Sequence, residues 1–233
     1  MKRILSIVFL VLSAQVLWAQ DIMEFVVIKD PTDTIVNIRE SYTAQSSIIS
    51  TVPNGTLLFC FGSRGNWASV EAMTGNEIKG GYIYKNFATP IYAFTELKPT
   101  DTKENQLVLQ GQGIEIIIST GPFDEKQHTY KYDETGKYII AIDDKWVWGT
   151  DGGMPTTEYK SVTVSFNGDT VTLPKEALHN LYQPNFTHTR AYYDEAADAL
   201  YITTLNSDGA GGYCLVFVIK DKKYKERVMN TGF

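Results

Sequence analysis

Few side chains in this sequence could act as nucleophiles, and Cys214 is the best placed of them. A catalytic cysteine needs a thiolate beside a histidine, commonly at the start of a helix. Cys214 instead precedes an apolar run, Leu215–Val218, and no histidine follows it in the sequence. The G-x-S-x-G string of a serine nucleophile elbow does not occur. The sequence therefore predicts a protein that is not an enzyme, in which Cys214 is a buried strand residue.

Three histidines are the remaining candidates for a metal site: His128, His179 and His188. None belongs to an H-E-x-x-H or C-x-x-C motif. His179 and His188 flank a short predicted helix and could approach each other, but zinc needs three or four ligands. We therefore expect no metal and no cofactor.

Cys60 is the second cysteine of the chain. In an exported protein it could pair with Cys214. Each of the two lies inside an apolar strand pattern, and they fall in different predicted domains. We expect two free thiols that pack as small hydrophobic side chains, with the disulfide as the alternative.

Two glycine-rich loops, over 146–155 and 207–213, hold the next candidates. Each places an aspartate before glycines at the end of a predicted strand, with an aromatic residue nearby. Such loops bring backbone N–H groups close to a ligand, and the aromatic ring offers a flat face. The ligand-binding residues predicted from this pattern are Trp148, Asp151, Asp208 and Tyr213. The alternative is plain turn chemistry, because Asp-Gly is a good turn former.

The elements that must position these residues are predicted to be strands. Alternating β-branched and aromatic runs recur, separated by Gly, Asn and Asp. Strands are expected over 25–28, 35–39, 48–52, 57–62, 67–71 and 81–84, and then over 114–119, 129–132, 138–142, 145–148, 161–166, 170–173, 199–205, 213–219 and 224–228. One short helix is expected over 173–182, with Pro174 at its start and Pro184 after its end.

The stretch from Ile35 to Tyr84 contains a series of short motifs: Asn37-Ile38-Arg39, Pro53-Asn54-Gly55, Asn66-Trp67 and Gly81-Tyr82-Ile83. In this order they resemble the bacterial SH3-like module, a small β-barrel of envelope proteins that usually binds rather than reacts. Tyr82 replaces the tryptophan that the family often has in its final strand. Tyr42 stands in a loop where the family usually has small residues and proline.

In members of that family, grooves lined by aromatic residues bind peptides or cell-wall stems. The resemblance therefore implies four ligand-binding residues, which are Tyr42, Trp67, Tyr82 and Tyr84. The residues by themselves leave an alternative open, because large aromatic side chains such as Trp67 and Tyr82 also dominate the cores of small barrels.

The first twenty residues are typical of a secretory signal peptide, with Lys2-Arg3, an apolar run over 4–18 and Ala19 at the cleavage site. The run is shorter than the ~20 residues that a membrane span needs, so we expect cleavage and no stable span. Loss of the two cations takes the formal net charge from −6 to about −8. Such an acidic chain argues against nucleic-acid partners. The expected location is the periplasm or the exterior.

Together these observations predict a mainly β protein. An SH3-like small barrel over 24–92 is followed by a polar linker over 95–105 and an all-β domain, a sandwich or barrel-like, over 106–233 with one short helix. The expected function is that of a secreted, non-catalytic binding protein of the bacterial envelope that recognises a peptide, a peptidoglycan stem or an envelope protein. Two alternatives stay open: an inhibitor or immunity-type protein that blocks a partner enzyme, and a cell-wall hydrolase with an unrecognised site.

Overall fold

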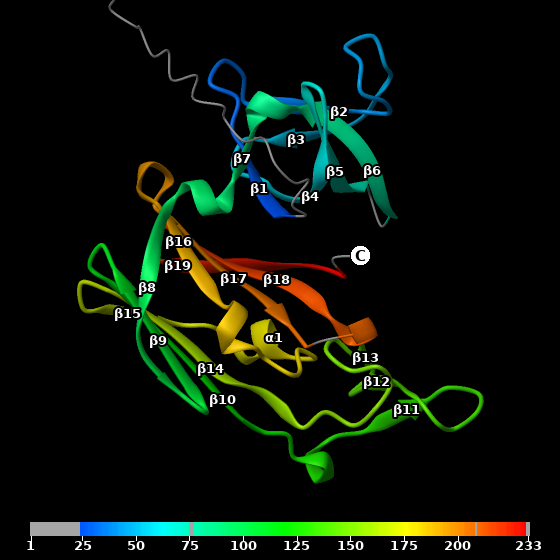
Figure 1. Ribbon diagram of the computed structural model, residues 1–233, viewed down its shortest axis with the longest axis vertical. Helices are drawn as coiled ribbons and strands as arrows, with labels where there is room; N and C mark the ends of the chain where they lie inside the picture. The colour runs from blue at the N-terminus through cyan, green and yellow to red at the C-terminus, as the bar shows by residue number, and fades with distance from the viewer. Residues whose placement is uncertain (1–23, 75–76, 208, 232–233) are drawn as a thin grey trace, which may run out of the picture.

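The computed structural model describes residues 24–74, 77–207 and 209–231. The predicted signal peptide and Asp208 lie outside the described residues. Within the described ranges the chain is mainly β, and its strands form a seven-stranded, a nine-stranded and a three-stranded sheet (Figure 1). Short 3₁₀ turns connect the strands, and they are η1 (Lys85–Phe87), η2 (Ile91–Ala93), η3 (Glu125–Gln127), η4 (Phe186–His188), η5 (Glu195–Ala197) and η6 (Gly209–Gly211).

The seven-stranded sheet forms the first unit, and we refer to it as the barrel. Its strands, in sheet order, are β3 (Ile48–Pro53), β2 (Ile35–Arg39), β6 (Glu77–Tyr84), β5 (Trp67–Thr74), β4 (Leu57–Arg64), β1 (Glu24–Ile28) and β7 (Ala88–Pro90). Period-two alternation sets the inner face, as in β2, where Val36 and Ile38 are buried and Ile35 and Asn37 are exposed. Val36 and Ile38 join a compact apolar cluster with Val70.

The nine-stranded sheet forms the second unit. Its strands, in sheet order, are β15 (Asp169–Thr172), β14 (Thr157–Phe166), β10 (Ile114–Pro122), β9 (Gln106–Gly111), β8 (Thr95–Lys103), β16 (Arg190–Asp194), β17 (Ala199–Asn206), β18 (Tyr213–Lys220) and β19 (Lys223–Asn230). Neighbouring strands in this order pair antiparallel. The sheet curls around the largest apolar core of the described chain, which includes Ile116, Val164 and Phe217.

The segment over 95–105, predicted to be a linker, is instead mostly strand β8. Its first residues pair with β16 and its later residues pair with β9, so β8 joins the two halves of the sheet. The strand changes partner between Leu97 and Lys98, and its register with β9 shifts shortly afterwards, between Pro99 and Asp101. Leu97 is fully buried, whereas most other β8 side chains are exposed. Backbone hydrogen bonds therefore hold this segment in the fold, although its side chains are polar.

The one α-helix among the described residues is shorter than the predicted span of 173–182. It is the single turn α1 (Lys175–Leu178), which lies between the two halves of the curled sheet (Figure 1). Arg227 donates to two backbone carbonyls at the end of the turn, at 2.7 and 2.9 Å. The next residues leave the helix because Asn180 has φ of 56° and its carbonyl accepts a hydrogen bond from Trp148 N. Tertiary hydrogen bonds therefore end the helix early.

The three-stranded sheet projects from the second unit on the side away from the barrel, and we call it the arm (Figure 1). Its strands are β11 (Tyr130–Tyr132), β12 (Ile139–Ile142) and β13 (Lys145–Trp146). Ile139 and Ile142 face a small buried cluster with Phe123. Four large apolar side chains remain exposed on the arm or beside it: Tyr132, Tyr138, Ile140 and Trp146.

The two units pack against each other through a fourth apolar cluster. Phe25, Val27 and Phe59 of the barrel contact the face of β17 and β18 that carries Tyr201 and Val218. Figure 1 shows the barrel standing on this face of the second sheet. Because these side chains are buried, separating the units would expose a continuous apolar surface, which water disfavours. The two units therefore form one compact body, joined by this cluster.

No disulfide joins Cys60 and Cys214. Cys60 is buried in β4, and its thiol donates to the Gly62 carbonyl at 3.3 Å. Cys214 is half-buried in β18. Both cysteines thus lie in strands as predicted, and the alternative of a disulfide between them is not observed.

Candidate functional site

The four barrel residues implied by the family resemblance lie on one connected surface. We call it the aromatic surface, and it consists of Tyr42, Arg64, Trp67, Tyr82, Tyr84 and Phe87. Register explains the arrangement, because Trp67 stands directly opposite Tyr84 in the β5–β6 pair. Tyr82 and Tyr84 are two residues apart and so point to the same side of β6. Ile83 between them points inward and is fully buried.

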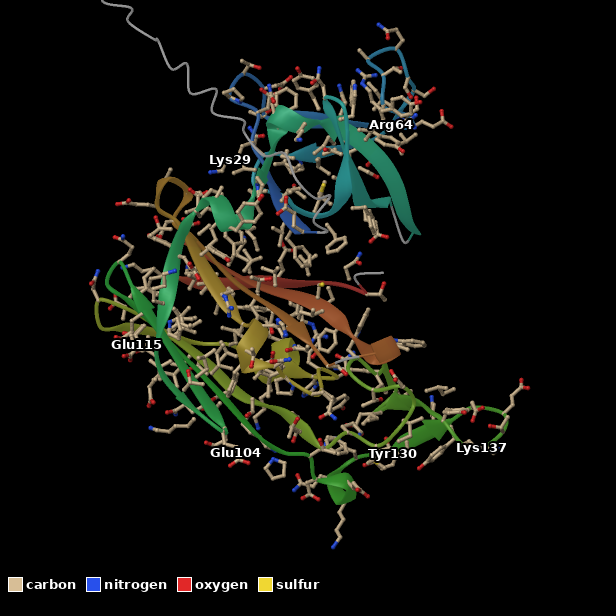
Figure 2. All side chains as sticks on the ribbon, in the orientation of Figure 1. Lys29, Arg64, Glu104, Glu115, Tyr130 and Lys137 are labelled. Atoms are coloured by element: carbon tan, nitrogen blue, oxygen red, sulfur yellow. The ribbon has the colours of Figure 1, made fainter. Side chains whose placement is uncertain are left out.

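The rings of the aromatic surface touch edge to face. The ring centres of Tyr42 and Tyr82 are 5.8 Å apart, and those of Trp67 and Tyr84 are 6.0 Å apart. The Arg64 guanidinium sits 3.9 Å from the centre of the Tyr42 ring, a cation–π contact at the rim of the barrel (Figure 2).

Exposure divides these rings into two kinds. Tyr42 and Tyr84 are 38% and 37% exposed, while Trp67 and Tyr82 are half-buried. Trp67 and Tyr82 therefore support their neighbours and still reach solvent, so the packing and binding interpretations both apply to them. The surface can offer flat apolar faces and one guanidinium to a ligand.

In the second unit, the two glycine-rich loops meet although they are far apart in sequence. Ser207 Oγ donates to the Gly149 carbonyl at 2.9 Å across a separation of 58 residues. A methyl group built on Gly211 would stand 2.7 Å from the Thr150 carbonyl carbon and 2.8 Å from Asp151 Oδ1. The glycines thus permit close contact between the two loops, and Asp151 stays exposed at their junction.

Tyr213 does not face a ligand, which corrects one predicted binding residue. Its side chain is fully buried, and its hydroxyl donates to the Tyr182 carbonyl at 3.0 Å. Its ring centre is 5.9 Å from that of Trp148, which is half-buried. Desolvation raises the pKa of Tyr213 well above its ordinary value, so the hydroxyl stays a donor. Tyr213 belongs to the core that supports the loops.

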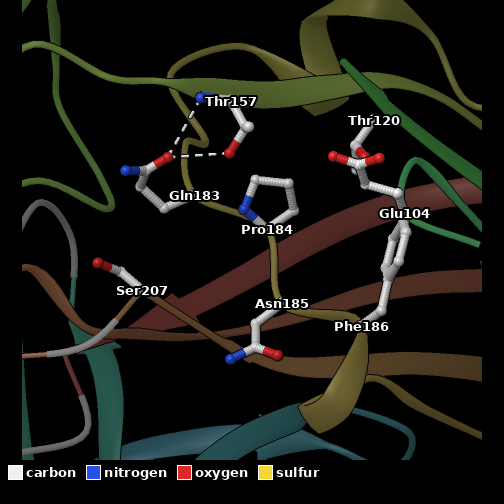
Figure 3. Close-up of a pocket in the computed structure, with 8 residues that line it drawn as sticks. All are labelled: Glu104, Thr120, Thr157, Gln183, Pro184, Asn185, Phe186 and Ser207. Atoms are coloured by element: carbon white, nitrogen blue, oxygen red, sulfur yellow. Dashed lines mark hydrogen bonds between the residues drawn. The ribbon is translucent and has the colours of Figure 1, made fainter. Parts of the chain in front are cut away.

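A polar pocket of about 450 Å³ opens beside the paired loops (Figure 3). The residues that line it are Glu104, Thr120, Thr157, Gln183, Pro184, Asn185, Phe186 and Ser207. Gln183 and Ser207 both have positive φ, of 52° and 61°, and Ser207 N donates to the Gln183 carbonyl at 3.0 Å. Gln183 Oε1 accepts from both the amide and the hydroxyl of Thr157. Left-handed backbone at two non-glycine residues costs energy, and here the hydrogen bonds hold it in place.

Beneath this pocket, Asn206 organises a buried polar network. Asn206 is fully buried, and its Oδ1 accepts from Asn185 N and from Thr204 Oγ1, both at 2.9 Å. Its Nδ2 donates to the Tyr159 hydroxyl at 2.9 Å. Sequence reasoning missed Asn206 and Gln183, since a single Asn or Gln at a strand end carries no motif. Their positions are visible only through partners that are distant in the chain.

Cys214 and His188 line one further cavity of about 210 Å³, between the two units, together with Glu24. Desolvation raises the pKa of the Cys214 thiol, which keeps it protonated and a poor nucleophile. Burial also raises the pKa of Glu24 to about 7, against smaller lowering effects of a hydrogen bond to Tyr92 and the charge of Lys85. Glu24 Oε2 is buried without a hydrogen-bond partner among the described residues. Cys214 and Glu24 therefore belong to a desolvated contact between the units, and the Cys214 thiol is not activated.

The other two histidines make local polar contacts in the second unit. His128 Nδ1 lies 2.6 Å from Asp143 Oδ2, and His179 Nδ1 lies 3.0 Å from Lys145 Nζ. In the part of the chain that the structure describes, no three or more His, Cys, Asp or Glu side chains cluster as metal ligands would.

No protein-family model matches the chain, and no curated protein and no solved structure is significantly similar to it. Over the described ranges, no helix has the length and apolar character needed to cross a membrane.

Proposed function

We propose that the protein is a secreted, non-catalytic binding protein of the bacterial envelope. In this proposal it recognises a peptide, with the peptidoglycan stem as the leading candidate, on the aromatic surface of the barrel. The observation that carries the proposal is the gathering of Trp67, Tyr82 and Tyr84 on one sheet face, with Tyr42 of the β2–β3 loop packed against Tyr82 and Arg64 against Tyr42. The resemblance of this unit to the bacterial SH3-like module supports the same assignment.

The physical basis of recognition would be apolar contact combined with charge. Tyr42 and Tyr84 offer partly exposed ring faces, which bind aliphatic groups at a low cost in side-chain entropy because each ring has few rotamers. Arg64 presents a guanidinium that suits a carboxylate of the ligand. The strand pairing beneath holds the rings in place before binding, which lowers the cost of ordering them.

The proposal predicts that Trp67→Ala weakens binding to purified cell wall by at least about tenfold, since an aromatic anchor is typically worth ~2 kcal/mol or more at a binding surface. Co-sedimentation of the protein with cell-wall sacculi measures the effect. Trp146→Ala is the matched control, because Trp146 is an exposed tryptophan on the arm. It should bind as the unaltered protein does.

Trp67 is half-buried, so each variant is first checked for cooperative urea unfolding. Tyr42→Ser is a second variant with a more exposed side chain and should also weaken binding. Retention of full binding by both folded variants would rule out the aromatic surface as the site.

A second candidate function, an inhibitor that blocks a partner enzyme, is favoured by the arm. Trp146 is 67% exposed in β13, and Tyr138, directly before β12, is 55% exposed. Exposed apolar groups on a projecting hairpin are typical of protein contacts. The paired glycine-rich loops stand next to this arm, since Gly152 packs against Tyr138.

The inhibitor function predicts a stoichiometric complex with an envelope enzyme, measured by size-exclusion chromatography of the full chain. Trp146→Ser and Tyr138→Ser should abolish the complex, whereas Trp67→Ala should leave it intact. The full chain is required because removal of the barrel would expose the apolar face around Tyr201. A complex that persists in both arm variants would exclude this function for the arm.

A further inference from the structure

A cleft of about 500 Å³ opens between the barrel and the second unit, at a place that none of the predicted site residues occupies. Small-molecule sites commonly have volumes of roughly 300–1,000 Å³ and often lie between domains. The barrel contributes the end of β1 and residues 29–31, and the second unit contributes parts of β17 and β18. Lys29 marks this side of the barrel in Figure 2.

The floor of the cleft is apolar. Val27 of β1 lies with Tyr201 of β17 and Val218 of β18 in the cluster that joins the two units, and all three line the cleft. Ala197 and Ala199 contribute only methyl groups beside them, which leaves room above the floor. An apolar ligand would therefore extend a hydrophobic cluster that already exists.

One wall of the cleft is an ion pair between a buried carboxylate and a partly exposed lysine. Lys29 Nζ lies 2.6 Å from Asp194 Oδ2, and Asp194 is only 4% exposed. The same ammonium sits 4.5 Å from the centre of the Phe94 ring. In these contacts Lys29 and Asp194 compensate each other's charge, so neither side chain is the main attraction for a charged ligand.

Asp30 also lies at the mouth, but its carboxylate serves its own turn. Asp30 Oδ1 accepts from Thr32 N at 2.8 Å, from Thr32 Oγ1 at 2.7 Å and from Asp33 N at 3.2 Å. These bonds lower the pKa of Asp30 and keep its negative charge on the exposed loop.

Lys220 supplies the positive charge of the cleft that has no ion-pair partner among the described residues. It lines the mouth, and its Nζ would stand 3.9 Å from a methyl group built on Gly55 of the barrel, so the ammonium reaches toward the barrel. Lys223 stands directly opposite it across the β18–β19 hairpin. In the described part of the chain neither of these two ammonium groups has an ion-pair partner, whereas Lys222 lies 3.4 Å from Asp169. Like charges in facing positions raise the local positive potential, which an anion would relieve.

We propose that this cleft binds a small apolar carboxylate. The apolar body lies on Val27, Tyr201 and Val218, and the carboxylate is held at the Lys220 ammonium. This site is separate from the aromatic surface, so the proposal does not depend on the proposed function of the barrel.

Isothermal titration calorimetry of the full chain with dodecanoate, below its micelle concentration, tests the proposal. One dodecanoate should bind per chain, with a negative heat-capacity change from the burial of apolar surface. Dodecyltrimethylammonium has the same alkyl chain and the opposite charge. Its affinity should be lower by at least about tenfold, because it cannot make a charge-assisted contact with Lys220. Absence of dodecanoate binding, or equal binding of the two amphiphiles, would overturn the proposal.

Two variants locate the site, and one control matches them. Lys220→Gln should weaken dodecanoate binding by about tenfold, and Ala197→Phe should abolish it by filling the cleft from its rim. Lys137→Gln removes an exposed lysine at the tip of the arm, far from the cleft (Figure 2), and should have no effect. Unchanged binding by a folded Lys220→Gln variant would place the amphiphile elsewhere and refute the assignment.

Discussion

The aromatic surface of the barrel and the paired loops of the second unit were predicted from the same kinds of residue, yet they are built in opposite ways. On the barrel, ring pairs such as Trp67–Tyr84 come from one hairpin and keep part of their area in solvent. In the paired loops, Tyr213 is fully buried and the glycines are used for contact between two loop backbones. Aromatic residues near glycines therefore form a solvent-exposed surface in one unit, whereas in the other unit they pack two loops together.

The largest effect that this comparison predicts is on the paired loops. Gly149→Ala should lower the free energy of unfolding by about 3 kcal/mol or more, because a methyl group there would stand 2.3 Å from the Tyr182 carbonyl oxygen at a φ of 108°. Urea unfolding monitored by tryptophan fluorescence measures the change.

Gly153→Ala is the control within the same loop, since no atom lies within 4 Å of its added methyl group. We expect a change of about 0.5 kcal/mol or less in that variant, as for surface substitutions generally. Equal destabilisation by the two substitutions would show that the loops are not packed as described.

An intermediate effect is expected at the cavity between the two units, which Glu24 lines. The pKa of Glu24 in the folded protein is about 7, above its ordinary value of 4.5, so folding favours the protonated form. The protonated carboxyl group of Glu24 makes its full contribution to the free energy of unfolding below about pH 4.5, and this contribution is lost as the pH rises through about 7. Glu24→Gln should therefore gain about 1 kcal/mol over the unaltered protein at pH 8, a value reduced for solvent screening because the side chain is only half-buried.

Thermal unfolding at pH 4.5 and at pH 8 compares the stability of the unaltered protein with that of Glu24→Gln. They should be equally stable at the lower pH and differ at the higher one. A difference of the same size at both pH values would show that Glu24 is not desolvated between the units.

The smallest effect on stability is expected on the aromatic surface. Tyr42→Ala should lower the free energy of unfolding by only about 0.5 kcal/mol, since the ring is 38% exposed and its contact with Arg64 is at the rim. Calorimetric unfolding checks this value. A loss above about 2 kcal/mol would make Tyr42 a core residue and would erase the difference between the two regions.

Local signals in the sequence predicted much of the strand order. Asn167-Gly168 is an Asn-Gly pair, the sequence most typical of a tight hairpin turn. The two residues adopt φ of 50° and 104°, and the flanking Phe166 and Asp169 pair directly. Segments without such a signal were missed. Strand β8 has only Leu97 as a fully buried side chain, and its stability comes from pairing with two strands that sequence does not reveal.

The candidate site was predictable to the same extent. Trp67 and Tyr82 share a face because period two and hairpin register are local properties. The contact between Ser207 and Gly149 across 58 residues has no local signature. The position of Lys220 opposite the barrel, in the cleft between the units, also has no local signature, because it depends on how two separate sheets pack.

The sequence by itself determined that this protein is mainly β, where its tight turns lie and which strand faces turn inward, because alternation and positive φ are set by neighbouring residues. Only the tertiary structure decided that β8 completes a nine-stranded sheet, that two glycine loops lock together and that the two units enclose a largely apolar cleft lined in part by Lys220. These features arise from pairing and packing between distant segments, and the side chains that form them acquire their surroundings only when the chain has folded.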